Sequence, residues 1–239
     1  ASSKESSKTE ETKTAATQVD IKVPEKREKK EYNTKLDSKT KERISEAVSL
    51  GNAGNSQEAK RLLEEAVKSE PKAYAAHYNL GVLSEREGKP QEAAVHYQKA
   101  LESEIDFSPA LINLVRLELR EGKNALQTAE RYIQLSPNNF EHQYAKLEAL
   151  LGSGKDQEAI EIIRRLLKKD EASTRLRYYM GLGEYHLGRY LLSQYVIEQA
   201  LLIETNDAEL YLLKAMVELK LESPIKAQEA VDLAEKINA

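Results

Sequence analysis

Glycine-rich motifs, histidines and paired carboxylates are the features of this sequence most suited to chemistry. Residues 152–156, with the sequence GSGKD, match the end of a phosphate-binding loop, in which backbone amides and a lysine hold phosphate oxygens. The full loop requires glycine where Ala149 stands and serine or threonine where Asp156 stands, and a strand must precede it. Because these conditions are not met, we interpret Gly154 and Lys155 as part of a turn between two helices.

The other candidate sites also lack essential parts. Residues 181–186 (GLGEYH) contain Gly-x-Gly but not the third glycine of a dinucleotide-binding fingerprint. No two histidines have the four-residue spacing that places two metal ligands on one helix face; they are His77, His96, His142 and His186. Carboxylate pairs such as Glu64 and Glu65 fall on charged helix faces, where solvation is their usual role. The sequence therefore predicts a protein that is not an enzyme and that uses no metal and no cofactor.

The composition excludes several classes of protein. The chain of 239 residues has 36 basic and 40 acidic side chains, a formal net charge of −4, so it lacks the basic excess typical of nucleic-acid-binding proteins. It contains no cysteine, which rules out disulfides and thiolate metal sites. No segment approaches the roughly 18 consecutive apolar residues that a membrane-spanning helix requires. With 40% hydrophobic residues, the chain is long enough to bury a core.

The first 38 residues differ in composition from the rest. They are rich in Ser, Thr, Lys and Glu and poor in apolar side chains, so we expect residues 1–38 to form a disordered tether. Within them, Val19, Ile21 and Val23 alternate with polar residues before Pro24, a pattern typical of a strand. Two interpretations stay open: a slightly less polar piece of the tether, or a docking strand that adds to the edge of a partner's sheet.

From about residue 40 onward the sequence repeats. One small residue recurs within each expected second helix, at intervals of 34, 32, 34, 34 and 34 residues. These residues are Ala59, Ala93, Ala125, Ala159, Ser193 and Ala227. A turn glycine recurs at a similar interval: Gly54, Gly88, Gly122, Gly154 and Gly188. Two helices in each period of 34 residues predict a helical solenoid, in which each pair buries its apolar face against its neighbours.

The repeat resembles the tetratricopeptide repeat, whose pattern is W-x2-L-G-x2-Y, then A-x3-F, then A, then P. The matching residues are His77-x-x-Leu80-Gly81, Ala93-x-x-x-Tyr97 and Ala100 in the second unit, with Pro71 and Pro137 ending the first and third units. The chain departs from the pattern because it has no tryptophan, because its third unit is two residues short, and because Glu222-Ser223-Pro224 stands at the last turn. The resemblance covers residues 40–239.

The resemblance implies an all-α fold, a right-handed α-solenoid of about six helix pairs in residues 39–239. The expected units are residues 40–73, 74–107, 108–139, 140–173, 174–207 and 208–239. We expect Gly81, Gly181 and Ala215 where the first helix of a unit approaches its second helix closely, since a larger side chain would push the two apart.

The resemblance also implies a partner-binding groove, because the first helices of tetratricopeptide-like stacks line a concave surface. The predicted groove residues are Tyr78, Asn79, Val82, Arg86, Asn113, Arg116, Arg120, Tyr144, Tyr178, Tyr179, Tyr185 and His186, with Ile44, Val48, Ile112, Glu148, Leu182, Leu212 and Met216 beside them. Tyrosine and arginine are enriched at protein interfaces. For Tyr78 and Tyr178, packing between adjacent helices stays open as an alternative. Arg86, Arg116 and Arg120 predict a locally positive groove and an acidic or carboxylate-bearing ligand.

One specialised member of the family can be excluded on its residues. Members that hold the C-terminal carboxylate of heat-shock chaperones use lysine and asparagine on one inner helix, asparagine on the next, and lysine and arginine on the third. Asn79 and Asn113 match, but their partners on the preceding first helix are Ile44 and Val48, or Tyr78 and Val82 in the next set of three units. The sequence therefore argues against an adaptor for chaperone tails.

Several functional expectations follow from the resemblance. It implies a non-enzymatic scaffold that binds a peptide or protein in the concave groove. A Ser-, Lys-, Thr- and Glu-rich start without methionine, followed by repeats, is similar to the pilotin lipoproteins of type IV pilus systems and to gliding-motility proteins. Such a protein sits on the periplasmic face of a bacterial outer membrane through an N-terminal lipid anchor. The alternatives are a cytoplasmic adaptor or assembly chaperone and, in another class, the substrate-recruiting subunit of an enzyme complex. Apolar residues near the end predict a surface for self-association; they are Leu219, Leu221 and Ile237.

Overall fold

The computed structural model describes residues 36–238, and within this range it contains twelve α-helices and no strand. The helices are α1 (Ser38–Asn52), α2 (Ser56–Ser69), α3 (Tyr74–Arg86), α4 (Pro90–Ser103), α5 (Ser108–Arg120), α6 (Ala125–Leu135), α7 (His142–Gly152), α8 (Asp156–Leu167), α9 (Thr174–His186), α10 (Tyr190–Ile203), α11 (Ala208–Lys220) and α12 (Pro224–Asn238). None of the helices in this part of the chain is long and apolar enough to cross a bilayer. Val19, Ile21 and Val23, the proposed docking strand, lie outside the described residues, as does almost all of the expected tether.

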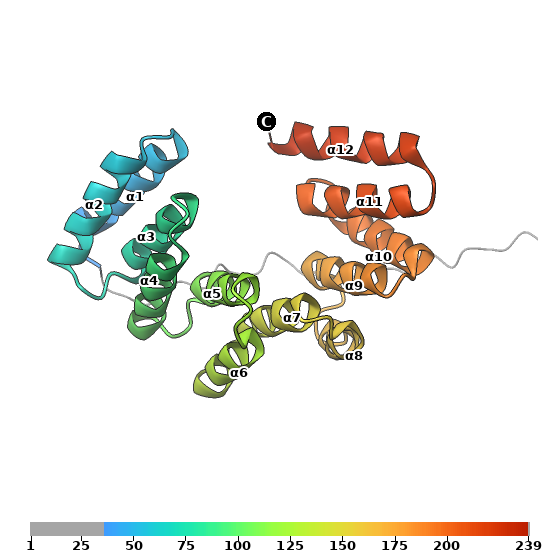
Figure 1. Ribbon diagram of the computed structural model, residues 1–239, viewed down its shortest axis with the longest axis horizontal. Helices are drawn as coiled ribbons and strands as arrows, with labels where there is room; N and C mark the ends of the chain where they lie inside the picture. Colours follow the sequence, from blue (N-terminus) through green and yellow to red (C-terminus); the bar gives the residue numbers. More distant parts are fainter. Residues whose placement is uncertain (1–35, 239) are drawn as a thin grey trace, which may run out of the picture.

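The helices follow one another along a curved path as successive pairs (Figure 1). Helices α5, α7 and α9 lie on the inside of the curve, and α6 and α8 lie on its outside (Figure 1). Among the described residues, each second helix before α12 contacts both the first helix of its own unit and the first helix of the next unit. The prediction of an all-α repeat solenoid is therefore confirmed.

Small residues allow the two helices of a pair to approach closely. Ala59, Ala93 and Ala159 are fully buried between the helices. A β-carbon built on Gly81 in α3 would lie only 2.6 Å from the Tyr97 ring of α4. Likewise, the hydroxyl of Ser193 in α10 donates a hydrogen bond of 2.7 Å to the backbone carbonyl of Gly181 in α9. Tight pairing therefore depends on the absence of side-chain bulk at these positions.

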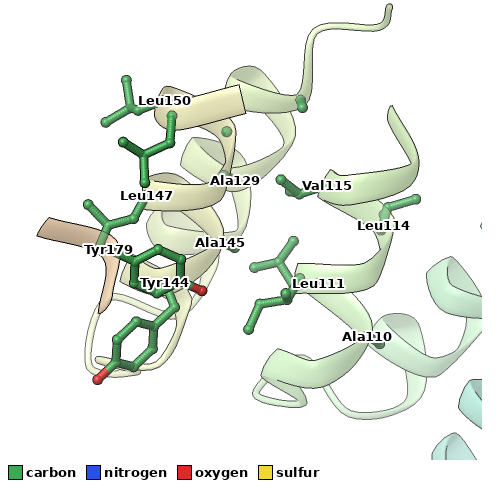
Figure 2. Close-up of a cluster of buried hydrophobic side chains, with 14 of the residues drawn as sticks. Ala110, Leu111, Leu114, Val115, Ala129, Tyr144, Ala145, Leu147, Leu150 and Tyr179 are labelled. Atoms are coloured by element: carbon green, nitrogen blue, oxygen red, sulfur yellow. The ribbon is translucent and has the colours of Figure 1, made fainter. Parts of the chain in front are cut away.

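Neighbouring units share one another's buried side chains. The largest hydrophobic cluster joins α4 through α9, with Tyr97, Leu111, Leu147, Ile163 and Tyr179 among its buried members. Figure 2 shows how side chains of α5 and α7 meet in the middle of this cluster. Since each pair covers the apolar face of the next, stability depends on the contacts between units as well as on those within them.

The short third unit changes the start of its second helix. Helix α6 begins at Ala125 itself, whereas α4 begins at Pro90, three residues before the corresponding Ala93. Helix α6 is 11 residues long, compared with 14 in α4. The two-residue deletion therefore removes the first turn of α6, which reduces its packing against α5.

The turn inside the sixth unit is strained. In the other five turns a glycine has a positive φ, between 66° and 86°, but Glu222 has a φ of 57°. For a residue with a β-carbon, this backbone conformation costs about 1–2 kcal/mol. The cost of replacing such a residue by glycine, whose unfolded chain has more conformational freedom, offsets part of this.

We expect Glu222→Gly to raise the free energy of urea unfolding by about 0.5–1 kcal/mol. Glu229→Gly, within α12, should instead lower it by about 1 kcal/mol. A lower free energy of unfolding in both variants would show that the backbone at Glu222 is not strained.

Candidate binding face on the first helices

One position of each first helix, repeated at the period of the units, forms a row along the solenoid. This central row consists of Val48, Val82, Arg116, Glu148, Leu182 and Met216. Val48 and Met216, near its two ends, are 38% and 42% exposed, and Val82 and Leu182 are half-buried. The central row thus presents apolar side chains on both sides of one acidic and one basic residue.

Side-chain bonds connect the first helices across the middle of the central row. Arg116 in α5 forms an ion pair with Glu148 in α7. The hydroxyl of Tyr179 in α9 donates to the same carboxylate over 2.7 Å. Arg120 in α5 forms an ion pair with Glu85 in α3. Four successive first helices are therefore joined by polar contacts as well as by apolar packing.

Glu85 is a member of this network that the sequence analysis missed. It accepts a hydrogen bond from the buried Tyr97 hydroxyl in addition to the one from Arg120. Asn113, a predicted groove residue, lies 3.4 Å from the hydroxyls of both Tyr78 and Tyr97. The only signal for Glu85 in the sequence was its position three residues after Val82, which places both side chains on one helix face.

The pairing changes the electrostatics expected for this face. The hydrogen bond with Glu148 raises the pKa of Arg116, and the attraction of the same carboxylate adds to it. Arg116 and Arg120 each face a carboxylate of their own chain, so the positive charge expected there is largely compensated. The third predicted arginine, Arg86, donates to the backbone carbonyl of Gly51 over 3.4 Å. The middle of the face is therefore polar but close to neutral.

The predicted groove tyrosines fall into two groups. Tyr144 and Tyr179 are 2% and 3% exposed, and their rings lie side by side in the core with centroids 5.9 Å apart (Figure 2). The prediction that these two rings offer surface to a partner is wrong, because both pack between neighbouring first helices. Tyr78 and Tyr178 are only half-buried, against Phe107 and Tyr179 respectively. These two rings combine helix packing with partial exposure, and their part in a binding groove stays a prediction.

A family model of the tetratricopeptide repeat matches residues 44–109 and 114–174, which together make up more than half of the sequence. The chain belongs to the tetratricopeptide repeat family. It is similar to the human protein O-mannosyl-transferase TMTC3, with 26% identity over 169 residues, or 67% of this chain and 18% of that protein. It is also 37% identical over 73 residues to the probable biofilm formation methyltransferase WspC of Pseudomonas putida, which is 30% of this chain and 17% of WspC. This tetratricopeptide repeat chain thus spans less than a fifth of either relative.

Solved structures of tetratricopeptide repeat and pilus proteins have a similar fold. A tetratricopeptide repeat protein from Parabacteroides merdae has a TM-score of 0.56 and 23% identity, covering 82% of this chain and 78% of that one. Pseudomonas aeruginosa pilF has a TM-score of 0.57 and 20% identity, with coverage of 82% and 90%. PilW, a widely conserved type IV pilus biogenesis factor, has a TM-score of 0.60 and 15% identity, with coverage of 81% and 91%. At these identities the similarity concerns the fold alone.

Three further predicted groove residues of this tetratricopeptide repeat chain lie away from the central network. The amide of Asn79 donates to the backbone carbonyl of Ala75 in its own helix over 2.8 Å. Tyr185 packs against Tyr190 of α10, with ring centroids 5.6 Å apart. His186 Nδ1 lies 2.7 Å from Oδ1 of Asp156, at the start of α8. The last two side chains therefore contact second helices near the end of α9, and they do not join the hydrogen-bond network.

Two histidines meet inside the second unit of the tetratricopeptide repeat stack. Nδ1 of His77 in α3 lies 3.4 Å from Nδ1 of His96 in α4, and Nε2 of His77 is 3.0 Å from the carbonyl oxygen of Pro71. Burial and, to a smaller extent, the neighbouring His77 together lower the pKa of His96 to about 4; burial also lowers the pKa of His77. Within residues 36–238, no cluster of three or more potential metal ligands includes them. Their lowered pKa values favour the neutral state of both rings.

This burial predicts a loss of stability in weak acid. In the unfolded chain a histidine titrates near pH ~6.5, so below that pH the unfolded state binds protons that the folded state excludes until about pH 4. Between pH 7 and pH 5 the free energy of urea unfolding should therefore fall by up to about 2 kcal/mol on account of His96. His96→Asn should show a correspondingly smaller fall over the same interval. Equal pH dependence in both proteins would contradict the buried, neutral state of His96.

Proposed function

We propose that this chain is a non-enzymatic scaffold that holds a protein or peptide partner against the central row and its neighbours. Tetratricopeptide repeat proteins bind protein or peptide partners, and this chain has the fold of that family. The observation that carries the proposal is the exposure of apolar side chains at the same register position of separate first helices, such as Val48 and Met216. Exposed apolar side chains add little to the buried core, so folding alone does not explain why they recur at the same position of the repeat.

The central row favours a partner with an apolar face. Its two ends can bury apolar surface, while the ion pair between Arg116 and Glu148 in its middle supplies polar contacts without a net charge. Partly exposed Tyr78 and Tyr178 add amphipathic rings that suit a protein interface. An acidic partner, proposed from the arginines, is less favoured at this face because both Arg116 and Arg120 are compensated.

The finer proposal is assembly of a bacterial envelope machine such as a pilus, secretin or motility complex. The support is the similarity in fold to pilF and to PilW, whose description is that of a type IV pilus biogenesis factor. Attachment to the periplasmic face of an outer membrane through an N-terminal lipid anchor belongs to the same proposal. The competing proposal is a cytoplasmic adaptor or assembly chaperone, and fractionation of cells expressing the natural gene distinguishes the two.

The binding face can be tested with substitutions at exposed positions, which spare the fold. Leu212 and Met216 are exposed on the first helix α11, whereas Val95 and Tyr195 are exposed on the second helices α4 and α10. We expect the double variant Leu212→Glu and Met216→Glu to lose partners that the wild-type chain retains in quantitative affinity purification. The matched variant Val95→Glu and Tyr195→Glu should keep them. If only the second variant loses partners, the proposed binding face is wrong.

A second candidate function is recruitment of substrate for an enzyme. The observation behind it is that the two relatives, TMTC3 and WspC, are named as transferases and match this chain over only part of their length. In this case the chain should co-purify with a transferase, and turnover by that transferase should fall when Leu212 and Met216 are replaced by glutamate.

Self-association is a further proposal, for which the support is the exposure of Leu219, Ile225 and Leu233 on the last helix pair. Sedimentation at several concentrations tests it.

A further inference from the structure

We propose that the cavity between α7 and α8 is a second docking site, which takes an acidic segment of a partner protein with one large apolar side chain. The cavity has a volume of about 610 Å³. Its lining comes from the connection before α7, from α7 itself, from the C-terminal half of α8 and from the turn after it: Pro137, Asn138, Phe140, Gln143, Lys146, Ile162, Arg165, Leu166 and Lys169. A volume of this size is typical of ligand sites, which range over about 300–1,000 Å³.

The cavity exists because two packing positions of the fourth unit carry polar residues. Gln143 and Lys146 stand two repeat periods after His77 and Leu80, which are both buried in the second unit: His77 contacts His96 of α4, and Leu80 packs in the cluster shared with α1 and α2. Closing α7 onto α8 in the same way would bury the ammonium group of Lys146 among apolar side chains, which is strongly unfavourable. Consistent with this, α7 and α8 contact each other less than the helices of any other pair. The opening is thus encoded at specific positions of the repeat.

The rim of the cavity is positively charged. Lys146, Arg165 and Lys169 contribute three cations, and none of the nine lining residues is acidic. Lys146 forms an ion pair of 2.9 Å with Glu130 in α6, and Arg165 and Lys169 are exposed at the end of α8. In a chain with a net charge of −4, a cluster of this kind selects an anionic partner by charge complementarity.

A pocket elsewhere in the stack lacks the excess of basic lining residues that the α7–α8 cavity has. The pocket between α11 and α12 also has a lysine, Lys214, at the register position of Lys146. There, however, Glu198, Glu218 and Glu229 line the pocket together with Lys214 and Lys226. Three carboxylates thus face two lysines in that pocket, whereas the α7–α8 cavity has no acidic lining residue, and Glu130, outside the lining, pairs only with Lys146.

The floor of the α7–α8 cavity accounts for the apolar part of the ligand. Ile162 and Leu166 are almost fully buried, and Phe140 is half-buried above them. An aliphatic or aromatic side chain that enters between the three cations would contact these residues and displace water from them. The ligand class that fits both features is a peptide segment in which a leucine or phenylalanine is flanked by aspartate or glutamate.

This site does not include the central row, so the two proposals can fail separately. The test uses fluorescence polarisation of a labelled peptide, GSDELDESG, titrated with the full chain. We expect saturable binding that is weakened at least about tenfold by the double variant Arg165→Glu and Lys169→Glu. The control Lys68→Glu and Lys168→Glu makes the same change in net charge at exposed positions outside the cavity, and it should bind as the wild type does. The Leu212→Glu and Met216→Glu variant should also bind normally.

Two further peptides test the chemistry of the ligand. In GSDESDESG the leucine is replaced by serine, and in GSKKLKKSG the acidic residues are replaced by lysine; both should bind much more weakly. Absence of saturable binding of the first peptide, or equal loss in the Lys68 and Lys168 control, would overturn the proposal. So would co-sedimentation with phosphatidylserine vesicles that the Arg165 and Lys169 variant abolishes, because it would assign the basic cluster to a membrane surface. Circular dichroism of each variant verifies that the helices remain folded.

Discussion

Replacing Leu80 by alanine is expected to lower the free energy of unfolding by about 2–5 kcal/mol. Leu80 is 2% exposed, and it packs in the cluster that joins the first unit to α3. The substitution removes buried apolar surface and leaves a cavity that the surrounding helices fill only in part. Because neighbouring units stabilise one another, hydrogen exchange should accelerate in α1 through α4 more than in α9 through α12. Urea unfolding and exchange mass spectrometry measure both effects.

The matched control is Leu202→Ala in α10. Leu202 is 75% exposed, so the same chemical change should alter the free energy of unfolding by no more than about 0.5 kcal/mol. If the two alanine variants unfold at the same urea concentration, the assignment of Leu80 to the interface between units is wrong.

Replacing Gly81 by alanine is expected to cost about 1–3 kcal/mol, although alanine is the better helix former. The new β-carbon would lie 2.6 Å from Cε1 of Tyr97, closer than van der Waals contact allows. The Tyr97 ring is fully buried, and its hydroxyl is held by Glu85, so the ring cannot move aside without breaking other contacts. The midpoint of thermal unfolding should therefore fall by several degrees.

Gly51→Ala provides the comparison for this prediction. A β-carbon on Gly51 would meet Leu83 and Ala59 at 3.7 and 3.8 Å, which is ordinary contact. With no clash to overcome, the gain in helix propensity should leave the protein equally stable or more stable by up to about 1 kcal/mol. A stabilising Gly81→Ala would show that α3 and α4 do not approach as closely as the structure indicates.

The helix pairs and their order could be predicted because their signals are local. Small residues such as Ala93 recur at the contact between paired helices, and turn glycines such as Gly88 recur where the backbone needs a positive φ. Each signal depends on a few neighbouring residues and repeats several times. In the described residues each expected unit contains two helices, and α1 begins at Ser38, two residues before the first unit.

The side-chain partners of the candidate face could not be predicted in the same way. Arg116 and Glu148 are 32 residues apart in the sequence, and Arg120 and Glu85 are 35 apart. Which acidic residue meets which arginine depends on how successive first helices are rotated and spaced, and a residue pattern along one helix carries little of that information. The burial of Tyr144 has the same origin, since adjacent first helices close over its ring.

The cavity between α7 and α8 could be predicted from the sequence only in part. The polar character of Gln143 and Lys146 was visible in the sequence, because the repeat places them at the positions that His77 and Leu80 hold in the second unit. The cavity that follows from them could not be predicted, because a polar residue at a packing position is accommodated either by a buried partner or by an opening between the helices. The structure shows the second outcome.

The most direct test of the proposed binding face compares three tyrosines as sites for photo-crosslinking. Tyr78 and Tyr178 lie on the first helices α3 and α9 and are half-buried, and Tyr195 lies exposed on the second helix α10. Each is replaced in turn by p-benzoylphenylalanine, which preserves an aromatic ring, and the chain is irradiated in the cells that express it. We predict protein adducts from positions 78 and 178 and none from position 195. Adducts from position 195 alone would show that the outer helices carry the partner, and this would contradict the account.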